Sequence, residues 1–414
     1  MDSPRLHRQR LVFLIAVAVI ALHVLDDSFV QPEPGTSAAD HLVSGLVPLA
    51  ALGIAAVAYA RMGPAWRATL ALVIGVFGIV AGLEGWHYTM TVGASGDDYT
   101  GLVALPAGVV LLLLGVVALW QSRRTEGSRG RRYLRRVLVG IAGAVVAVLF
   151  LQSFMASYAY THLARAVVPD ADLGGAAYDD VKFETPDDLE LEGWYIPSKN
   201  GAAVIAFPGR SGSRTPARFL ARHGFGVLLF DRRGEGDSEG DPNALGWNGG
   251  NDLEGAIAFL RTRPDVDPER IGGIGLSVGG EMLIEKAAET DALKAVVSEG
   301  AGIRSISEAN ELSGGAEKWL QVAAMASMTA GTAIFSNNRP PENLKDLVRR
   351  IAPRPVFLIY ADRGQGGEEL NTDFYDAARQ PKQLWRTDSG HVGGYDAAPR
   401  EYERRVVRFF NKSL

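Results

Sequence analysis

Ser277 stands at the centre of the stretch IGGIGLSVGGEM, residues 271–282. Its surroundings have the pattern Gly-x-Ser-x-Gly, in which a serine on a sharp turn between a strand and a helix attacks an acyl carbonyl. The pattern alone is a weak signal, because the chain has 48 glycines among 414 residues. Here, however, an apolar run ends at Leu276 and a helical pattern begins near Val278. We therefore predict a catalytic nucleophile, the alternative being a glycine-rich turn with an incidental serine.

A serine hydroxyl needs a base to take its proton and a carboxylate to orient that base. In proteins with a nucleophile elbow the chain order is serine, acid, histidine. Residues 170–414, which we interpret as a soluble globular part, contain only two histidines, His223 and His391. His223 precedes Ser277 near the end of a helical pattern and is predicted to be a structural or surface residue. His391 follows the last predicted strand, in TDSGHVGG, and is the predicted base.

Two carboxylates are candidates for the acid. Asp362 ends the apolar run VFLIYA, where such an acid is expected. Glu368 follows the glycine-rich loop RGQGG, which would let a longer side chain fold back toward His391. We favour Glu368 and keep Asp362 open. The alternative for each of them is a charged loop residue that is exposed to solvent and has no role in catalysis.

The oxyanion of an acyl-transfer reaction needs two preorganised N–H donors. The residue after the nucleophile, Val278, is expected to supply one backbone N–H. The loop PGRSGS after the run VIAF is expected to supply the other, through the N–H of Arg210.

The sequence after residue 180 alternates strand and helix patterns. Two short alternating runs separated by PDD indicate an antiparallel hairpin. The later runs are continuously apolar, as in strands of a parallel sheet that are buried on both faces. This order predicts an α/β doubly wound, mostly parallel sheet. The predicted strands are 181–185, 189–196, 202–207, 226–231, 270–276, 294–299, 355–361 and 382–387, and the predicted helices are 214–223, 248–261, 278–289, 343–350, 371–379 and 399–411.

These residues resemble the α/β-hydrolase superfamily, most of all bacterial dienelactone hydrolases, serine aminopeptidases and prolyl-oligopeptidase-type catalytic domains. The motifs that carry the resemblance are GLSVGG (275–280), SGH (389–391), FPGRSG (207–212) and DRRGEGDSEG (231–240). The resemblance implies a hydrolase domain over 181–414, with Asp231 and Arg233 bracing loops beside the active site. The family's usual Gly-x-x-Asp pattern is missing from the acid loop, which leaves the acid open.

The first 160 residues are of a different kind, with long apolar runs and few charges. A spanning helix needs about 20 mostly apolar residues. The sequence predicts an all-α transmembrane region, followed by a linker at 161–180. The five predicted helices are 8–28, 41–60, 68–90, 101–121 and 136–158.

Arginine-rich and acidic loops alternate between these helices, and arginine-rich loops stay in the cytoplasm. We therefore expect a multi-pass protein of the cell membrane with a cytoplasmic N-terminus and the hydrolase domain outside the cytoplasm. No small-x-small cleavage site follows the first apolar run, so we interpret it as an uncleaved helix.

Several ionisable residues fall near the predicted outer face of this region. Glu84 and His87 are three residues apart and share a helix face. They allow a metal or proton-handling cluster, or simply interfacial caps and hydrogen bonds between helices. The set is His23, Asp26, Asp27, Asp40, His41, Glu84 and His87.

The segment 300–342 interrupts the strand–helix alternation and is predicted to be a cap-like insertion. Its large apolar side chains are candidates for an acyl pocket or for ordinary core packing. They are Trp319, Met325, Met328 and Phe335.

The sequence as a whole predicts a membrane-anchored serine hydrolase that cleaves a carboxylic ester or thioester through an acyl-enzyme. The expected partners are a small-molecule acyl substrate and the lipid bilayer. Net charge is −5 and there is no cysteine, so we expect neither nucleic-acid binding nor thiol chemistry. No metal or organic cofactor is expected. The alternatives are an aminopeptidase-like serine peptidase and a membrane transporter or sensor whose hydrolase-like domain only binds ligand.

Overall fold

The chain divides into two compact units. The first, here called the helical unit, contains Met1–Ala164 and Ala323–Asn338. The second, the sheet unit, contains Arg165–Val322 and Arg339–Leu414. The structure, a computed structural model, describes residues 4–91, 93–94, 96–121, 151–162, 173–207, 214–312, 314–315 and 317–414.

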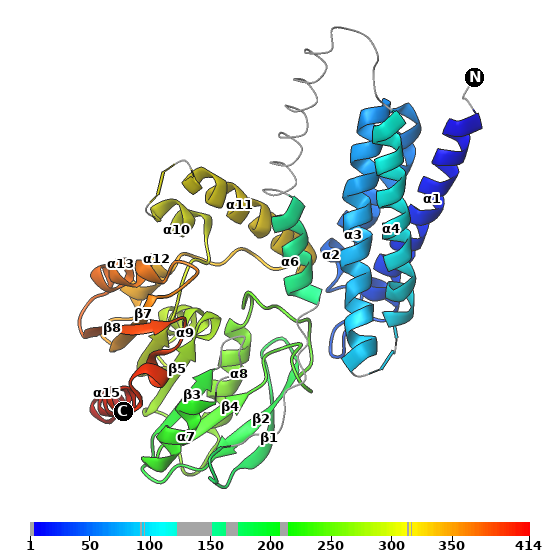
Figure 1. Ribbon diagram of the computed structural model, residues 1–414. Coiled ribbons are helices and arrows are strands. Elements are labelled where there is room, and N and C mark those ends of the chain that lie inside the picture. The colour runs from blue at the N-terminus through cyan, green and yellow to red at the C-terminus, as the bar shows by residue number, and fades with distance from the viewer. Residues whose placement is uncertain are drawn as a thin grey trace. The chain divides into compact units, whose positions relative to one another are not determined.

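Long apolar helices make up the helical unit (Figure 1). Within the described residues, four of its helices are long and apolar enough to cross a membrane, over Leu6–Val30, Leu42–Arg61, Pro64–Met90 and Asp98–Leu119. The fifth predicted segment, 136–158, lies outside the described residues as far as residue 150, and its last part belongs to α6. The elements are α1 (Pro4–Leu25), η1 (Asp26–Val30), α2 (Leu42–Ala58), η2 (Tyr59–Arg61), α3 (Pro64–Thr91), α4 (Asp98–Gln121) and α6 (Gln152–His162).

Glycines bring α3 and α4 into close contact. A Cβ added at Gly82 of α3 would lie 2.5 Å from the backbone nitrogen of Leu105 in α4. A Cβ added at Gly108 of α4 would lie 2.6 Å from the backbone nitrogen of Ile79. Small residues that allow such backbone approach are typical of helix pairs in membranes.

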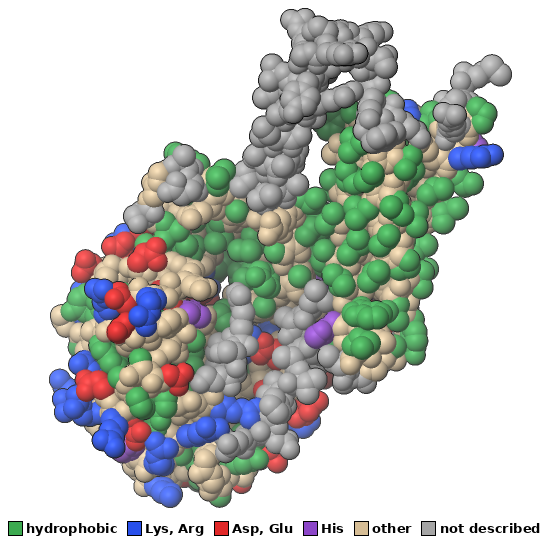
Figure 2. All heavy atoms as spheres, in the orientation of Figure 1, with side chains coloured by type: hydrophobic (Ala, Val, Ile, Leu, Met, Phe, Trp, Pro, Cys, Tyr) green, Lys and Arg blue, Asp and Glu red, His purple; other side chains and the backbone are tan. Residues whose placement is uncertain are grey.

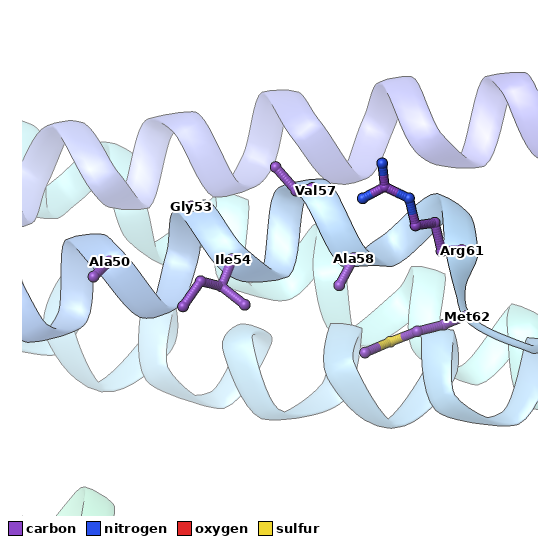
Figure 3. A pocket seen from close by; sticks show the side chains of 7 residues that line it. All are labelled: Ala50, Gly53, Ile54, Val57, Ala58, Arg61 and Met62. Atoms are coloured by element: carbon purple, nitrogen blue, oxygen red, sulfur yellow. The ribbon is translucent and has the colours of Figure 1, made fainter.

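The surfaces of the two units differ in kind. Figure 2 shows hydrophobic side chains over the visible face of α3 and α4, whereas Lys, Arg, Asp and Glu side chains gather on the sheet unit. α2 also carries a shallow hollow of about 620 Å³ with an almost wholly apolar lining and Arg61 at one end (Figure 3). An apolar outer surface of this kind is expected of helices that face lipid.

Hydrogen bonds between helices account for several of the ionisable residues in the helical unit. His23 Nδ1 lies 3.2 Å from Thr100 Oγ1, and the same hydroxyl donates to Asp26 at 2.8 Å. Tyr158 donates to Glu84 at 3.5 Å. These contacts join α1 to α4 and α3 to α6. Within the described ranges, no group of three or more such side chains is arranged to hold a metal ion.

The sheet unit is built on one eight-stranded sheet of order β1-β2-β4-β3-β5-β6-β7-β8. β1 and β2 are antiparallel to each other, β2 is antiparallel to β4, and the remaining pairs are parallel. The predicted α/β doubly wound fold is therefore confirmed. The strands are β1 (Asp179–Glu184), β2 (Glu190–Ile196), β3 (Ala203–Phe207), β4 (Gly226–Phe230), β5 (Ile271–Leu276), β6 (Ala295–Glu299), β7 (Val356–Arg363) and β8 (Lys382–Gly390).

Helices cover both faces of this sheet (Figure 1). One apolar cluster joins the sheet to α8, α9, α12 and α13, and another joins its other face to α7 and α15. Every residue of β3, β4, β5 and β6 is buried, which explains their continuous apolar sequences. The helices are α7 (Thr215–Arg222), α8 (Gly250–Arg261), α9 (Val278–Glu289), α10 (Ile306–Glu311), α12 (Leu344–Arg350), η4 (Glu368–Leu370), α13 (Asn371–Ala377), α14 (Gly394–Ala397) and α15 (Pro399–Ser413).

Helix α11 (Glu317–Phe335) belongs to both units. Its C-terminal part packs in the helical unit, where the ring of Phe335 lies 5.1 Å from the rings of both Phe154 and Tyr158. Just beyond the helix, Asn337 donates to the backbone oxygen of Asp40 at 3.0 Å. The last part of the predicted cap-like insertion, 300–342, therefore completes the core of the helical unit.

The sheet changes winding direction between β3 and β5. The chain runs from β3 to β4 on one side and then returns to β5 on the other side of β3. At such a switch point the carboxyl ends of the strands leave a crevice that commonly binds ligands. The loop after β3 and the turn after β5 both begin there.

Candidate active site

Ser277 occupies a strained turn at the carboxyl end of β5. Its φ and ψ are 54° and −126°, a conformation that non-glycine residues rarely adopt. Two glycines make the turn possible. A Cβ at Gly275 would lie 2.3 Å from the backbone oxygen of Gly279, and one at Gly280 would lie 2.3 Å from Ser298 Oγ. The chain can therefore pass directly from strand to helix while the Ser277 side chain remains partly exposed.

His391 lies beside this serine. It follows the end of β8, and its Nε2 lies 2.9 Å from Ser277 Oγ. Gly300, which follows β6, leaves room for the imidazole, because a Cβ there would approach His391 within 3.3 Å. The two residues are 114 positions apart in the chain, and parallel strands bring them to one edge of the sheet.

Glu368 is the carboxylate that reaches His391. Its Oε1 is hydrogen-bonded to His391 Nδ1, and its Oε2 accepts from the backbone N–H of Ala361 at 2.8 Å. The side chain is only 1% exposed. The glycine-rich loop allows this burial, since a Cβ at Gly364 would lie 2.5 Å from the Glu368 carboxyl carbon and one at Gly302 would lie 2.3 Å from the oxygen of Gly366.

Asp362, the other candidate acid, lies elsewhere. It forms an ion pair with Arg386, whose Nε donates to its carboxylate at 2.7 Å. Its side chain is 40% exposed. The structure thus brings Glu368 to His391 and leaves Asp362 at the surface.

The charge of Glu368 changes the proton affinity of His391. The hydrogen bond to Glu368 raises the pKa of His391 above its usual 6.5, against the opposing effect of partial burial. A buried carboxylate at Nδ1 also leaves Nε2 to face Ser277 as the proton acceptor. The three side chains can therefore pass a proton from the serine hydroxyl to the imidazole.

The two predicted oxyanion donors differ in what the structure describes. Val278 is the first residue of α9 and is buried. Arg210 lies outside the described residues, together with the rest of 208–213. His223, predicted to be structural or at the surface, pairs with Glu403 at 2.9 Å.

Glu299 is a residue of the site that sequence reasoning missed. It ends β6 and is 3% exposed, and burial raises its pKa. Its carboxylate accepts from the Tyr402 hydroxyl at 2.6 Å and from the backbone N–H of Gly394 at 2.9 Å, while its backbone oxygen accepts from the backbone N–H of Ser277 at 2.7 Å. It therefore ties the serine turn to the segment after His391. The only signal in the sequence was a single charge at the end of an apolar run.

Arg233, in the segment after β4, forms a buried ionic network. Its guanidinium contacts Asp252 at 2.7 Å and Asp187 at 2.8 Å, which connects the segment to α8 and to the β1–β2 turn. Asp231 bonds through its backbone, donating to Glu192 at 2.9 Å. Bracing is thus the role of Arg233 in the structure.

The candidate acyl-pocket residues do not share one environment. Phe335 is buried in the helical unit, whereas the Trp319 side chain of the sheet unit is 70% exposed. Met325 and Met328 are half-buried. The pocket interpretation is therefore wrong for Phe335, which is a core residue.

Comparison with known proteins identifies the family of the sheet unit. The sequence profile of the X-Pro dipeptidyl-peptidase (S15) family matches residues 176–388, from just before β1 into β8. The chain belongs to the X-Pro dipeptidyl-peptidase (S15) family. It is thus a hydrolase with an α/β-hydrolase catalytic domain.

Two individual relatives and one solved structure resemble this S15-family chain in sequence. The protein YfhR of Escherichia coli K12 is 26% identical over 255 residues, which cover 57% of this chain and 81% of YfhR. The thiohydrolase aneE of Aspergillus aculeatus is 33% identical over 129 residues, which cover 29% of this chain and 41% of that protein. Among solved structures, the esterase Pf2001 of Pyrococcus furiosus aligns with a TM-score of 0.48 and 26% identity, over 60% of this chain and 98% of the esterase.

Proposed function

We propose that this S15-family hydrolase uses Ser277 as a nucleophile, His391 as a general base and Glu368 as the acid that orients it. The observation that carries the proposal is the continuous hydrogen-bonded chain from Ser277 Oγ through the His391 imidazole to the buried Glu368 carboxylate. Its order in the sequence is serine, acid, histidine, as the nucleophile elbow requires.

The proposed reaction proceeds through an acyl-enzyme. Ser277 Oγ bonds to the acyl carbon as its proton passes to His391 Nε2, and the carbonyl oxygen becomes an oxyanion facing the backbone N–H of Val278 and, as proposed from the sequence, of Arg210. Collapse expels the alcohol or thiol, which takes the proton from His391. Water then attacks the acyl-enzyme with His391 again as base, releasing the acid and restoring Ser277.

The proposed substrate is a carboxylic ester or thioester. A dipeptidyl-peptidase must also hold the free ammonium group of its substrate, for which a carboxylate is the usual partner. Three of the described carboxylates that act on His391 already accept hydrogen bonds from other protein groups. Glu368 bonds to His391 and Ala361, Glu299 to Tyr402 and Gly394, and Glu281 to the backbone of Gly302. An uncharged acyl group makes no such demand. The thiohydrolase relative supports the thioester option.

A serine peptidase is the second candidate function, favoured by the family to which the chain belongs. The chemistry at Ser277 would be the same, with an amine as the leaving group in place of an alcohol or thiol.

We also propose that the helical unit anchors the enzyme in the cell membrane as a multi-pass protein. Its four long apolar helices and the close glycine packing of α3 and α4 support this. The arginine-rich loops at 61–67 and 122–135 support a cytoplasmic N-terminus. With the fifth segment predicted from the sequence, 136–158, the proposed number of crossings is odd, which leaves the sheet unit outside the cytoplasm.

The test is covalent labelling of the full chain in detergent micelles with a fluorophosphonate probe. We expect labelling of the wild type and none of Ser277→Ala, together with release of p-nitrophenol from p-nitrophenyl acetate by the wild type alone. If the folded wild type takes no label, the proposed enzymatic function is contradicted and a domain that only binds ligand is favoured. Faster cleavage of an X-Pro-p-nitroanilide than of any ester or thioester would favour the peptidase.

A further inference from the structure

Most of helix α11, in the second half of the insertion, carries no charged residue. No Asp, Glu, Lys or Arg occurs from Trp319 to Asn338, a stretch that contains most of α11. Its C-terminal part lies among the apolar helices of the helical unit, where Thr332 is completely buried and a Cβ at Gly331 would lie 2.0 Å from Ser157 Oγ. Solvent-exposed helices normally carry charged residues on one face, so this composition is unusual for a helix in water.

The first half of the same helix exposes large apolar side chains. Trp319 is 70% exposed and Leu320 48% exposed, and Ile306 of the neighbouring helix α10 is 40% exposed. We call these three residues the apolar edge. Every residue from Val322 to Thr329 is only half-buried, so the exposed apolar surface continues along α11.

The root of the insertion is fixed to the sheet unit beside the candidate site. Glu308 is buried and accepts from the backbone N–H groups of Arg304 and Ser305 at 2.9 Å, and it also bonds to the N–H of Leu344 at the far end of the insertion. Just before this clamp, Ala301 accepts from Asn371 at 2.7 Å, and Asn371 also bonds to the backbone of Glu368. The segment that carries the apolar edge therefore starts from the residues that hold the acid.

From these observations we propose that the apolar edge lies in the lipid–water interface of the bilayer and that the substrates of Ser277 are acyl esters held in that bilayer. The argument for lipid is continuity. Trp319 is four residues before Ala323, about 6 Å along the same helix, and from Ala323 onward that helix belongs to the unit proposed to span the membrane. Tryptophan is the side chain most typical of this interface. The substrate class rests on the proposed function, whereas the position of the apolar edge does not.

The position can be tested without any activity, because the chain has no cysteine. Trp319→Cys in the full chain gives a single attachment site for a nitroxide spin label in vesicles of phosphatidylcholine and phosphatidylglycerol. The matched control is Asp291→Cys, whose side chain is 94% exposed and lies before β6, away from the strand ends that carry the site. We expect the label at 319 to collide more with oxygen than with a water-soluble nickel chelate, and the label at 291 to show the reverse. Equal access of the chelate to both labels would overturn the proposal.

The substrate class needs a second measurement. Trp319→Glu should lower the ratio of the rate on p-nitrophenyl palmitate in vesicles to the rate on soluble p-nitrophenyl acetate by about tenfold. An unchanged ratio would overturn the substrate assignment. If the wild type cleaves neither ester, the proposed function fails while the spin-label result still decides where the apolar edge lies.

Discussion

The proposed acid, Glu368, follows the glycine-rich loop after β7, and its role can be tested by substitution. Glu368→Gln keeps the shape of the side chain but removes the charge that stabilises the imidazolium of His391. We expect kcat on a soluble ester to fall by about 10⁴-fold, as for the equivalent acid-to-amide change in other serine hydrolases. Asp362→Asn is the control and should change kcat less than about twofold, because Asp362 pairs with Arg386. A larger loss in the Asp362 variant than in the Glu368 variant would reverse the assignment.

The raised pKa of His391 predicts the pH dependence. The base must be neutral to accept the proton of Ser277, so activity is lost as pH falls through its pKa. Because Glu368 raises this pKa, the acidic limb of the kcat/KM profile should have its midpoint above 6.5. The midpoint should move to lower pH in Glu368→Gln. A midpoint that stays in place in that variant would show that another group controls the limb.

At the scale of the elements, the acid depends on a close approach between two backbone segments. A Cβ at Gly302 would lie 2.3 Å from the oxygen of Gly366, so Gly302→Ala must displace the loop that carries Glu368. We expect about 1–3 kcal/mol of destabilisation from overpacking, and a His391 midpoint shifted to lower pH. In the control, Gly250→Ala, the new Cβ meets nothing nearer than 3.6 Å. Thermal unfolding and a pH profile of both variants provide the measurement, and a Gly302 variant that behaves like the control would contradict the role of the loop.

The same elements explain which features were readable from the sequence. The strands of the sheet unit were, because strands buried on both faces are continuous apolar runs that end at turn residues. The positions of Ser277 and His391 could also be predicted, because each lies in a short motif next to a strand end. The choice between Asp362 and Glu368 was not, since it depends on the path of a glycine loop. The sequence also did not predict which unit α11 packs in. A helix with an apolar face has the same sequence pattern whether it covers a site or completes another core.

At the scale of the whole molecule, the proposed orientation predicts which side of the membrane the sheet unit occupies. In a chain without native cysteine, Asp291→Cys should react in intact cells with a membrane-impermeant maleimide, because its exposed side chain would lie outside the cytoplasm. The control is Arg10→Cys, near the N-terminus, which should react only after lysis. Labelling in the opposite order would reverse the topology.

Helix α11 takes the chain into the helical unit before the last two strands of the sheet unit have been made. Strands β7 and β8, and with them Glu368 and His391, come after the segment that packs beside Phe154 and Tyr158. Ser277 is therefore synthesised before this segment, and Glu368 and His391 only after it. When the helical unit is not assembled, the Phe335 side chain lacks the apolar neighbours that bury it. The proposed triad can therefore be completed only after the segment that closes the core of the helical unit has been made.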